Sequence, residues 1–413
     1  MKTSHRLRSV GSGLGVTVPA PRSVWRAAFE GDPHAQAFHS PEWVDGVCAT
    51  GRYENATRLY ETSDGRLLVM PMVRRSLVGG AIAYQGSLPP NWGIGGLLSD
   101  SPIRPEDVSA VCSDLRRQRG VLRTLIQPAA RTGPLWAAAA LPGVKSVPRL
   151  AHVLDLTGGF DAVWKGFAQS GRRAVRKAER CGLDVQCDTS GALLPQFFEL
   201  HEQNVRRWAK QQHEPLWLSR LRDRGRDTLP KLQAMAAAVP SSFRLYLASQ
   251  GGTVIAAIIV WRGAGTRYTH GAMIREIAGP TRANYLLHRM AIEDACQAGS
   301  THLDFGESGA SEELAFFKTR FGARPHPYRQ YVVESLPVTE LDRSLRTAVK
   351  KVLRFREPGP VPESVVTGPA SSTPDEAARE AASAVRAGTT HEPSPPASSS
   401  HPQADGRRAP TDS

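Results

Sequence analysis

The sequence lacks the cysteine patterns and long apolar runs that define several classes of protein. Its five cysteines are scattered and form no C-x-x-C pair, which argues against a zinc ribbon or a thioredoxin-type site. The longest apolar run, residues 254–261, is too short for a membrane helix, and no apolar signal core follows the basic start of the chain. We therefore expect a cytoplasmic protein with reduced thiols and no transmembrane segment.

The chain does carry an excess of positive charge. Lys and Arg total 52 against 39 Asp and Glu, which gives a formal net charge of +13 over 413 residues. Such charge favours polyanionic partners: nucleic acid, phosphorylated small molecules or anionic lipid. With 40% apolar and 22% charged residues, the composition is typical of a globular protein with two or three domains.

The two ends of the chain differ from its middle. Residues 358–413 hold ten of the 31 prolines, many Ser and Ala, and no Leu, Ile, Phe, Tyr or Trp. Such a segment buries too little apolar area to offset its ordering entropy. We expect residues 1–20 and 358–413 to be disordered, with the folded part between them.

The folded part predicts two halves with one order of elements. In the second half the order is three strands, helix, strand, helix, strand, over residues 243–249, 254–262, 267–273, 284–298, 301–305, 311–320 and 328–334. The first half repeats this order more weakly, with strands at 57–61, 66–74, 122–127 and 146–156 and helices at 105–118 and 135–140. We infer two similar domains of class α/β (α+β), over residues 21–156 and 157–357; the alternative is chance recurrence.

A cluster of positive charge lies between the two halves. Ser170 is a plausible N-cap for a short helix that carries Arg172, Arg173, Arg176 and Lys177. Helical spacing puts Arg172 and Arg176 on one face and the other two on a neighbouring face. Two interpretations stay open: a solvated basic face, and a phosphate-binding edge of a cleft between the domains.

Several short motifs are specific in their combined order and spacing. They are Phe38-x-Ser40-Pro41-Glu42-Trp43, a glycine-rich stretch at 93–97, the basic segment at 172–185, Asn284-Tyr285, Asp304-Phe305-Gly306, Phe317-Lys318-x-x-Phe321-Gly322-Ala323 and Tyr328. Together they resemble the FemAB-type transferases, a branch of the GNAT acyltransferase superfamily, over roughly residues 25–336.

The resemblance implies a fold and an activity. The fold would be two tandem GNAT-like domains, each with a mixed, mostly antiparallel sheet flanked by helices. The activity would be transfer of an acyl group to an amine, from aminoacyl-tRNA in some members and from acyl-CoA in others. The matching lysine of the family is Lys318, for which the resemblance implies an electrostatic role.

One segment departs from the simple acetyl-CoA pattern. There a glycine-rich loop binds pyrophosphate at a helix N-terminus, but residues 277–284 have the wrong glycine spacing, and Pro280 lacks a backbone donor. We therefore expect aminoacyl-tRNA as the donor, tRNA as a partner, no cofactor, and a peptidoglycan precursor or natural-product amine as the acceptor. An acyl-CoA donor is the alternative, and a non-catalytic module that binds a phosphorylated ligand is a second one.

Aminolysis of an ester or thioester needs a neutral amine, donors for the oxyanion and a proton for the leaving group. We expect Lys318 to stabilise the oxyanion or hold a phosphate, with a surface lysine as the plain alternative. Tyr268 and His270 share a strand face by their spacing of two, and His270 is a candidate acceptor of the amine proton. The alternative for His270 is a hydrogen-bonded histidine that lines a cleft.

Three further residues complete the predicted site. Glu307 is expected to orient or deprotonate the amine. Asp304 and Asn284 are expected to bind substrate, although Asp304 fits equally well as a cap of the loop that follows it. None of these side chains has metal-ligand spacing, and we expect no metal.

Overall fold

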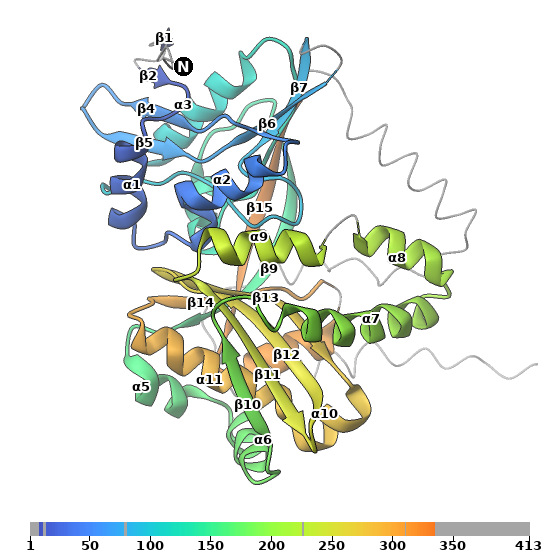
Figure 1. The fold of residues 1–413 in the computed structure, drawn as a ribbon. Helices are drawn as coiled ribbons and strands as arrows, with labels where there is room; N and C mark the ends of the chain where they lie inside the picture. The colour runs from blue at the N-terminus through green and yellow to red at the C-terminus, as the bar shows by residue number, and fades with distance from the viewer. Residues whose placement is uncertain (1–7, 11–13, 78–80, 225–226, 310, 335–413) are drawn as a thin grey trace, which may run out of the picture.

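One long sheet runs through both halves of the chain and joins two lobes, drawn one above the other in Figure 1. The computed structural model describes residues 8–10, 14–77, 81–224, 227–309 and 311–334. The sheet has eleven strands in the order β10-β11-β12-β13-β14-β9-β15-β8-β7-β6-β3. The predictions for residues 335–357 and for a disordered tail at 358–413 lie outside the described residues.

The lower lobe follows the predicted order of elements. It contains β11 (Phe243–Gln250), β12 (Thr253–Trp261), β13 (Gly265–Met273), α11 (Ala283–Gln297), β14 (His302–Glu307), α12 (Glu312–Thr319) and β15 (Arg324–Glu334). The first three strands pair antiparallel, so the predicted meander is confirmed. An additional helix, α10 (Arg275–Thr281), fills the connection between β13 and α11 and was not predicted.

The upper lobe also follows its prediction, with additions. It contains α1 (Arg22–Gly31), α2 (Pro41–Ala49), β3 (Glu54–Asn55), β4 (Arg58–Glu61), β5 (Leu67–Met70), β6 (Val73–Leu77), β7 (Ile82–Gly86), α3 (Pro105–Arg116), β8 (Val121–Ile126), α4 (Gly133–Ala138) and β9 (Lys145–Asp155). The strand predicted at 66–74 is two strands in two sheets, because Pro71 interrupts it and has no backbone N–H for a ladder.

The remaining helices lie mainly on the lower lobe. They are α5 (Gly159–Gly166), α6 (Gln169–Glu179), α7 (Leu194–Gln211), α8 (Leu216–Arg224) and α9 (Leu229–Ala238), with the edge strand β10 (Asp184–Asp188) between α6 and α7. Figure 1 shows α7 and α9 on the side of the sheet that faces the viewer, with α8 projecting outward. None of the helices in the described part is long and apolar enough to cross a bilayer.

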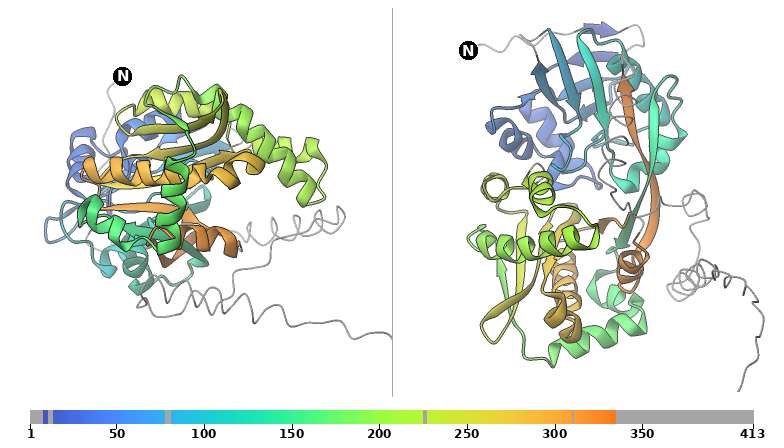
Figure 2. Two further views of the ribbon diagram at one scale, coloured as in Figure 1. Left: turned by 90° about the horizontal axis from the view of Figure 1, so that it is seen from below. Right: turned by 90° about the vertical axis from the view of Figure 1, so that its right-hand side faces the viewer.

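The last strand of each half pairs with the other half. β9 ends the first half but lies between β14 and β15, while β15 ends the second half and lies between β9 and β8. The long β15 spans the two lobes in the right-hand view of Figure 2. A domain boundary near residue 156 stays a prediction, but cutting the chain there would separate each lobe from one of its strands.

The N-terminal segment is more ordered than expected where it is described. β2 (Leu14–Thr17) pairs with β1 (Arg8–Val10) and β4 in a smaller four-stranded sheet. Leu14 and Val16 are buried in the upper lobe, which explains why this stretch does not remain loose. The expectation of disorder over residues 1–20 is therefore wrong for residues 14–20.

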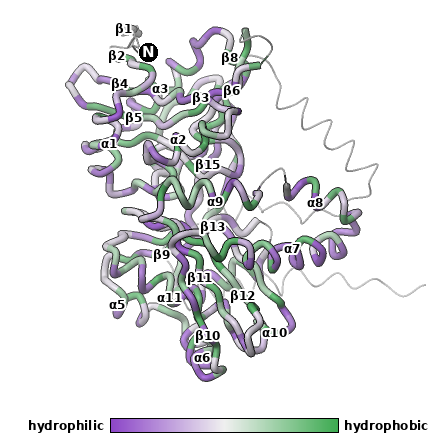
Figure 3. Tube along the Cα trace, in the orientation of Figure 1, coloured by the Kyte–Doolittle hydropathy of each residue, from purple (hydrophilic) through white to green (hydrophobic). Residues whose placement is uncertain are grey.

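One apolar cluster of the described residues crosses from one lobe to the other. Trp43 of α2 packs edge-on against Trp261 of β12, with ring centroids 4.7 Å apart, and Phe243 lies 5.1 Å from Trp261 on the other side. The same cluster includes Phe197 of α7. Figure 3 shows the apolar colouring along β11 and β12, beneath the more polar α7. Burial of this cluster fixes the upper lobe against α9 and the sheet.

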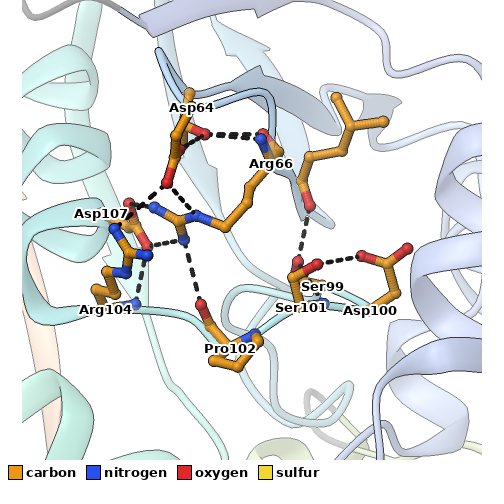
Figure 4. Close-up of polar contacts among 10 residues, drawn as sticks. Asp64, Arg66, Ser99, Asp100, Ser101, Pro102, Arg104 and Asp107 are labelled. Atoms are coloured by element: carbon orange, nitrogen blue, oxygen red, sulfur yellow. Dashed lines mark hydrogen bonds and ion pairs between the residues drawn. The ribbon is translucent and has the colours of Figure 1, made fainter.

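A polar network fixes the turn between β4 and β5 to α3 (Figure 4). Arg66 donates to both carboxylate oxygens of Asp107, at 2.6 and 2.9 Å, and to Asp64 at 2.9 Å. Asp107 also accepts from the backbone N–H of Arg104 at 2.8 Å, which caps the start of α3. These contacts lie away from the cavity described next.

Candidate active site

A cavity of about 720 Å³ opens where the ladder between β13 and β14 ends. The two strands pair in parallel only from Gly265–His302 to Arg267–Asp304, and residues on both strands beyond that point line the cavity. Much of the remaining wall comes from α7, α9, α11, α12 and residues 91–94 of the upper lobe. A large cavity between lobes, at the carboxyl ends of parallel strands, is the usual place for a binding site in such folds.

Lys318 is the buried cation of this cavity. Its side chain comes from α12, is only 1% exposed, and donates from Nζ to the carbonyl oxygens of Gly306 and Glu307, both at 2.9 Å. Burial, partly offset by the charge of Asp304, lowers the pKa of Lys318 to about 7. These carbonyls use two of the three ammonium donors, which leaves one for an oxygen atom in the cavity.

Asp304 shapes the turn beneath Lys318. It is fully buried, forms an ion pair with Arg267, and accepts a hydrogen bond from the backbone N–H of Gly306 at 2.7 Å. Gly306 has φ near 70°, a conformation that glycine adopts without strain. Asp304 does not line the cavity, so the structure places it as the cap of the loop, while Arg267 beside it faces the cavity.

Glu307 reaches the cavity wall and is held by side chains of β9 and β15, the two strands that pair with the other half of the chain. Tyr328 of β15 donates its hydroxyl to Glu307 at 2.6 Å, and Arg149 of β9 donates to the other carboxylate oxygen at 3.4 Å. Burial, together with the charge of Glu307, raises the pKa of Tyr328 well above its usual value, so this hydroxyl keeps its proton.

A β-bulge separates Tyr268 from His270. Val260 pairs with Tyr268 and the next residue back along β12, Ile259, pairs with His270, so Thr269 is an extra residue on β13. The extra residue breaks the alternation, and the prediction of one shared face is wrong: Tyr268 packs on His288 of α11, and His270 packs on Phe197 of α7. Both side chains still line the cavity because it reaches both faces of β13.

Both ring nitrogens of His270 already have partners. Nε2 lies 3.2 Å from a carboxylate oxygen of Asp227, just before α9, and Nδ1 lies 2.9 Å from the hydroxyl of Thr269. Lys231 of α9 contacts the second oxygen of Asp227 at 2.8 Å. Burial raises the pKa of Asp227, but its contacts to His270 and Lys231 outweigh this and lower it strongly. The geometry makes His270 a link between β13 and α9 and leaves no nitrogen free to accept a substrate proton.

Two residues of α11 present unpartnered polar atoms. Asn284 lines the cavity; its Nδ2 donates to Met273 Sδ at 3.0 Å and its Oδ1 is buried without a partner. One turn later lies His288, which was not among the predicted site residues and whose Nε2 is also without a partner. No amphipathic pattern marks His288, because every face of this part of α11 is buried.

The four cations of α6 lie away from the cavity, at the far end of the lower lobe in Figure 1. Arg172 donates to the carbonyls of Lys165 and Phe167 at the end of α5, while Arg173, Arg176 and Lys177 are exposed. The structure does not bring them to the candidate site, because the small residues of α6 face the core and turn the charges outward.

The start of α6 also differs from its prediction. The helix begins at Gln169 after an N-cap at Ala168, so the expectation that Ser170 caps it is wrong. Among the described residues, no group of three or more His, Cys, Asp or Glu side chains is arranged to hold a metal ion.

Comparison with known proteins identifies the class. Residues 165–318 match the family model described as an acetyltransferase (GNAT) domain, so the chain contains an acyltransferase domain of this type. The structure of FemX superposes with a TM-score of 0.58 at 11% sequence identity, over 78% of this chain and 98% of that one. The chain therefore has the fold of FemX, and the predicted α/β class with a GNAT domain in the second half is confirmed.

Two further solved structures match less well. A tandem GNAT protein from the clavulanic acid biosynthesis pathway has a TM-score of 0.43 and 15% identity, over 78% of this chain and 99% of that one. The C-terminal domain of a putative lysylphosphatidylglycerol synthetase from Agrobacterium fabrum has a TM-score of 0.42 and 10% identity, over 79% and 95%. No protein of curated function matches the chain in sequence.

Proposed function

We propose that this acyltransferase forms an amide bond by direct aminolysis, transferring an aminoacyl group from aminoacyl-tRNA to an amine acceptor. The observation that carries the proposal is the buried ammonium of Lys318, held by two carbonyls at the wall of the cavity. Its remaining donor is placed to bind the acyl oxygen as negative charge develops there. A fixed donor in a buried site stabilises an oxyanion without having to reorganise.

The lining of the cavity favours direct attack over a covalent intermediate. None of the five cysteines lines it, and burial raises the pKa of Cys48, Cys112, Cys187 and Cys296, which keeps these thiols protonated. Glu307, held by Tyr328 and Arg149, is the carboxylate that would orient the incoming amine. The acceptor is a peptidoglycan precursor or a natural-product amine.

The choice of donor depends on the connection between β13 and α11. α10 fills this connection and contains Pro280, and Arg282 then adopts a left-handed conformation before α11 begins. This arrangement replaces the open glycine-rich loop whose backbone donors bind pyrophosphate in simple acetyl-CoA enzymes. The net charge of +13 supports a polyanionic donor such as tRNA.

An acyl-CoA donor is the second candidate function. It is favoured by the match of residues 165–318 to the acetyltransferase (GNAT) domain. The cavity is large enough for an acyl chain together with an amine, and its volume does not distinguish the two donors.

Filter binding of the full chain to bulk bacterial tRNA, charged and uncharged, at two salt concentrations tests the donor. We expect a preference for charged tRNA and a steep loss of affinity with salt, because several phosphate contacts release counterions. Binding that ignores charging, or no binding, would contradict the tRNA proposal and leave a panel of acyl-CoA thioesters, followed by thiol release, as the next assay. Binding without transfer in both assays would indicate a non-catalytic binding module.

A further inference from the structure

His288 is a deeply buried polar side chain of the cavity wall that the site described so far does not use. It comes from α11, is 3% exposed, and lines the cavity. Aromatic rings surround it, with centroids 4.8 Å away for Tyr268, 5.1 Å for Phe317, 5.6 Å for Phe321 and 5.7 Å for Phe305.

The hydrogen bonds of His288 fix the position of its proton. Nδ1 lies 2.8 Å from the backbone carbonyl oxygen of Asn284, one turn earlier on α11. A carbonyl oxygen can only accept, so Nδ1 must carry the proton, and Nε2 must present a lone pair. Nε2 is buried and has no hydrogen-bond partner. Leaving a buried acceptor unpaired is costly, which points to a donor supplied by a ligand.

The surroundings keep this lone pair free at neutral pH. Burial lowers the pKa of His288 to about 4, and the nearby charge of Lys318 adds to this against the opposing effect of the Asn284 carbonyl. Negative charge that develops on an acyl oxygen beside Lys318 would raise the proton affinity of Nε2 again. Nε2 of His288 is therefore unprotonated in the free protein and becomes more basic as the reaction proceeds.

We propose that Nε2 of His288 accepts the proton that the acceptor amine releases, an inference that rests on the acyl transfer proposed above. The amine nitrogen bonds to the acyl carbon, and the bond from that carbon to the leaving oxygen or sulfur breaks. One N–H proton passes to Nε2 and then to the leaving atom, so His288 ends the cycle neutral. This role differs from that first expected of His270, whose two nitrogens both have partners.

The same geometry selects a class of acceptor. The unpartnered Oδ1 of Asn284 lies on the same face of α11, one turn from His288, where side chains four residues apart are neighbours. A neutral primary amine has two N–H groups, one for each of these acceptors. A secondary amine has only one and would leave Asn284 Oδ1 unpaired, so the site takes primary amines.

Activity measurements on three variants test the proposal. We expect His288→Phe, which keeps the aromatic packing, to lower kcat about 10²- to 10⁴-fold with the donor KM unchanged. His288→Gln can accept a hydrogen bond but not a proton; we expect it to recover the amine KM and not kcat. His302→Phe is the matched control, since His302 is equally buried, does not line the cavity, and should keep kcat within about twofold.

Retention of wild-type kcat by His288→Phe would overturn the proposal, and equal rates with n-butylamine and N-methylbutylamine would overturn the choice of primary amines. If the wild-type chain transfers nothing from aminoacyl-tRNA or acyl-CoA, the proposed function fails, and binding of an amine still tests the site.

Spectra of ¹⁵N-histidine-labelled protein should show an unprotonated Nε2 for His288 that shifts on addition of n-butylamine. The shift should be lost in Asn284→Ala; a protonated Nε2, or no shift, would reject the assignment.

Discussion

At the scale of single residues, the site depends on the ammonium of Lys318. We expect Lys318→Met to lower kcat/KM at least about 100-fold. The substitution removes the buried ammonium at the cavity wall and with it the fixed donor for the oxyanion. Steady-state kinetics with the identified donor would measure this. Lys165→Met, on an exposed position of α5, is the control that should leave the rate unchanged. A Lys318→Met protein within tenfold of wild type would contradict the role.

Buried histidines make the stability of the protein depend on pH. Burial lowers the pKa of His152, His288 and His302 to about 4, below the value of 6.5 that they have when exposed. Between these values the unfolded chain binds more protons than the folded one, so stability falls as pH falls from 6.5 toward 4. The expected loss is about 1.4 kcal/mol per histidine for each pH unit near the middle of this window.

Urea unfolding at pH 7 and pH 5 would measure this effect. The double variant His288→Phe/His302→Phe should show a smaller difference between the two pH values than the wild-type chain. An unchanged midpoint for the wild type would mean that these imidazoles are solvated and titrate normally.

At the scale of elements, the bulge in β13 decides what the strand presents to the cavity. Tyr268 and Gly271 lie on the α11 face, and a Cβ on Gly271 would clash with the hydroxyl of Tyr268. We expect Gly271→Ala to displace the Tyr268 ring from His288 and to lower kcat/KM about tenfold, because a small misplacement of a site residue is costly. Kinetics and thermal unfolding would measure it.

Gly279→Ala in α10 is the matched control for that variant. A Cβ there meets no atom within 4 Å, and alanine favours a helix over glycine by about 0.5–1 kcal/mol. We expect Gly279→Ala to be as stable as wild type or more so, with full activity. Equal activity of both alanine variants would show that Tyr268 does not position anything at the site.

The elements themselves are largely readable from the sequence, because their signals are local. Pro105 marks the start of α3, and the glycines after residues 250 and 262 separate the strands of the meander. The bulge at Thr269 has no such signal, since an extra residue shows only in the register with the neighbouring strand. The same limit explains α6, whose cations form a clear pattern but whose position depends on which face packs against α11.

Site residues divide in a similar way. Lys318 and Glu307 were found because aromatic and glycine motifs surround them in the chain, and the structure places both at the cavity. His288 and Asp227 carry no such local signal, since their significance arises from contacts with α12 and β13 that are distant in sequence. Catalytic roles for all of these residues stay predictions until the variants are measured.

At the scale of the whole molecule, β9 and β15 couple the two halves of the chain, because each pairs with strands of the other half. β9 completes the sheet against β14, and β15 completes it against β8. We expect the chain to unfold in urea as one cooperative transition, and residues 1–156 expressed alone to lack native structure because β8 has lost β15 and β9 has lost both of its neighbours. Far-UV circular dichroism and tryptophan fluorescence would measure both. Two separate transitions, or a folded fragment of residues 1–156, would contradict the coupling.

The pairing of β9 and β15 with the opposite half also delays the completion of the sheet during synthesis. β8 leaves the ribosome roughly 200 residues before its partner β15, and β9 leaves roughly 150 residues before β14. At ribosomal speeds of about 5–20 residues per second, β8 and β9 are synthesised about 7 to 40 s before these partners. During that time the nascent chain displays unpaired strands of the kind that aggregate. We therefore expect the shared sheet to make the nascent chain depend on chaperones, and slower synthesis to lengthen the vulnerable interval.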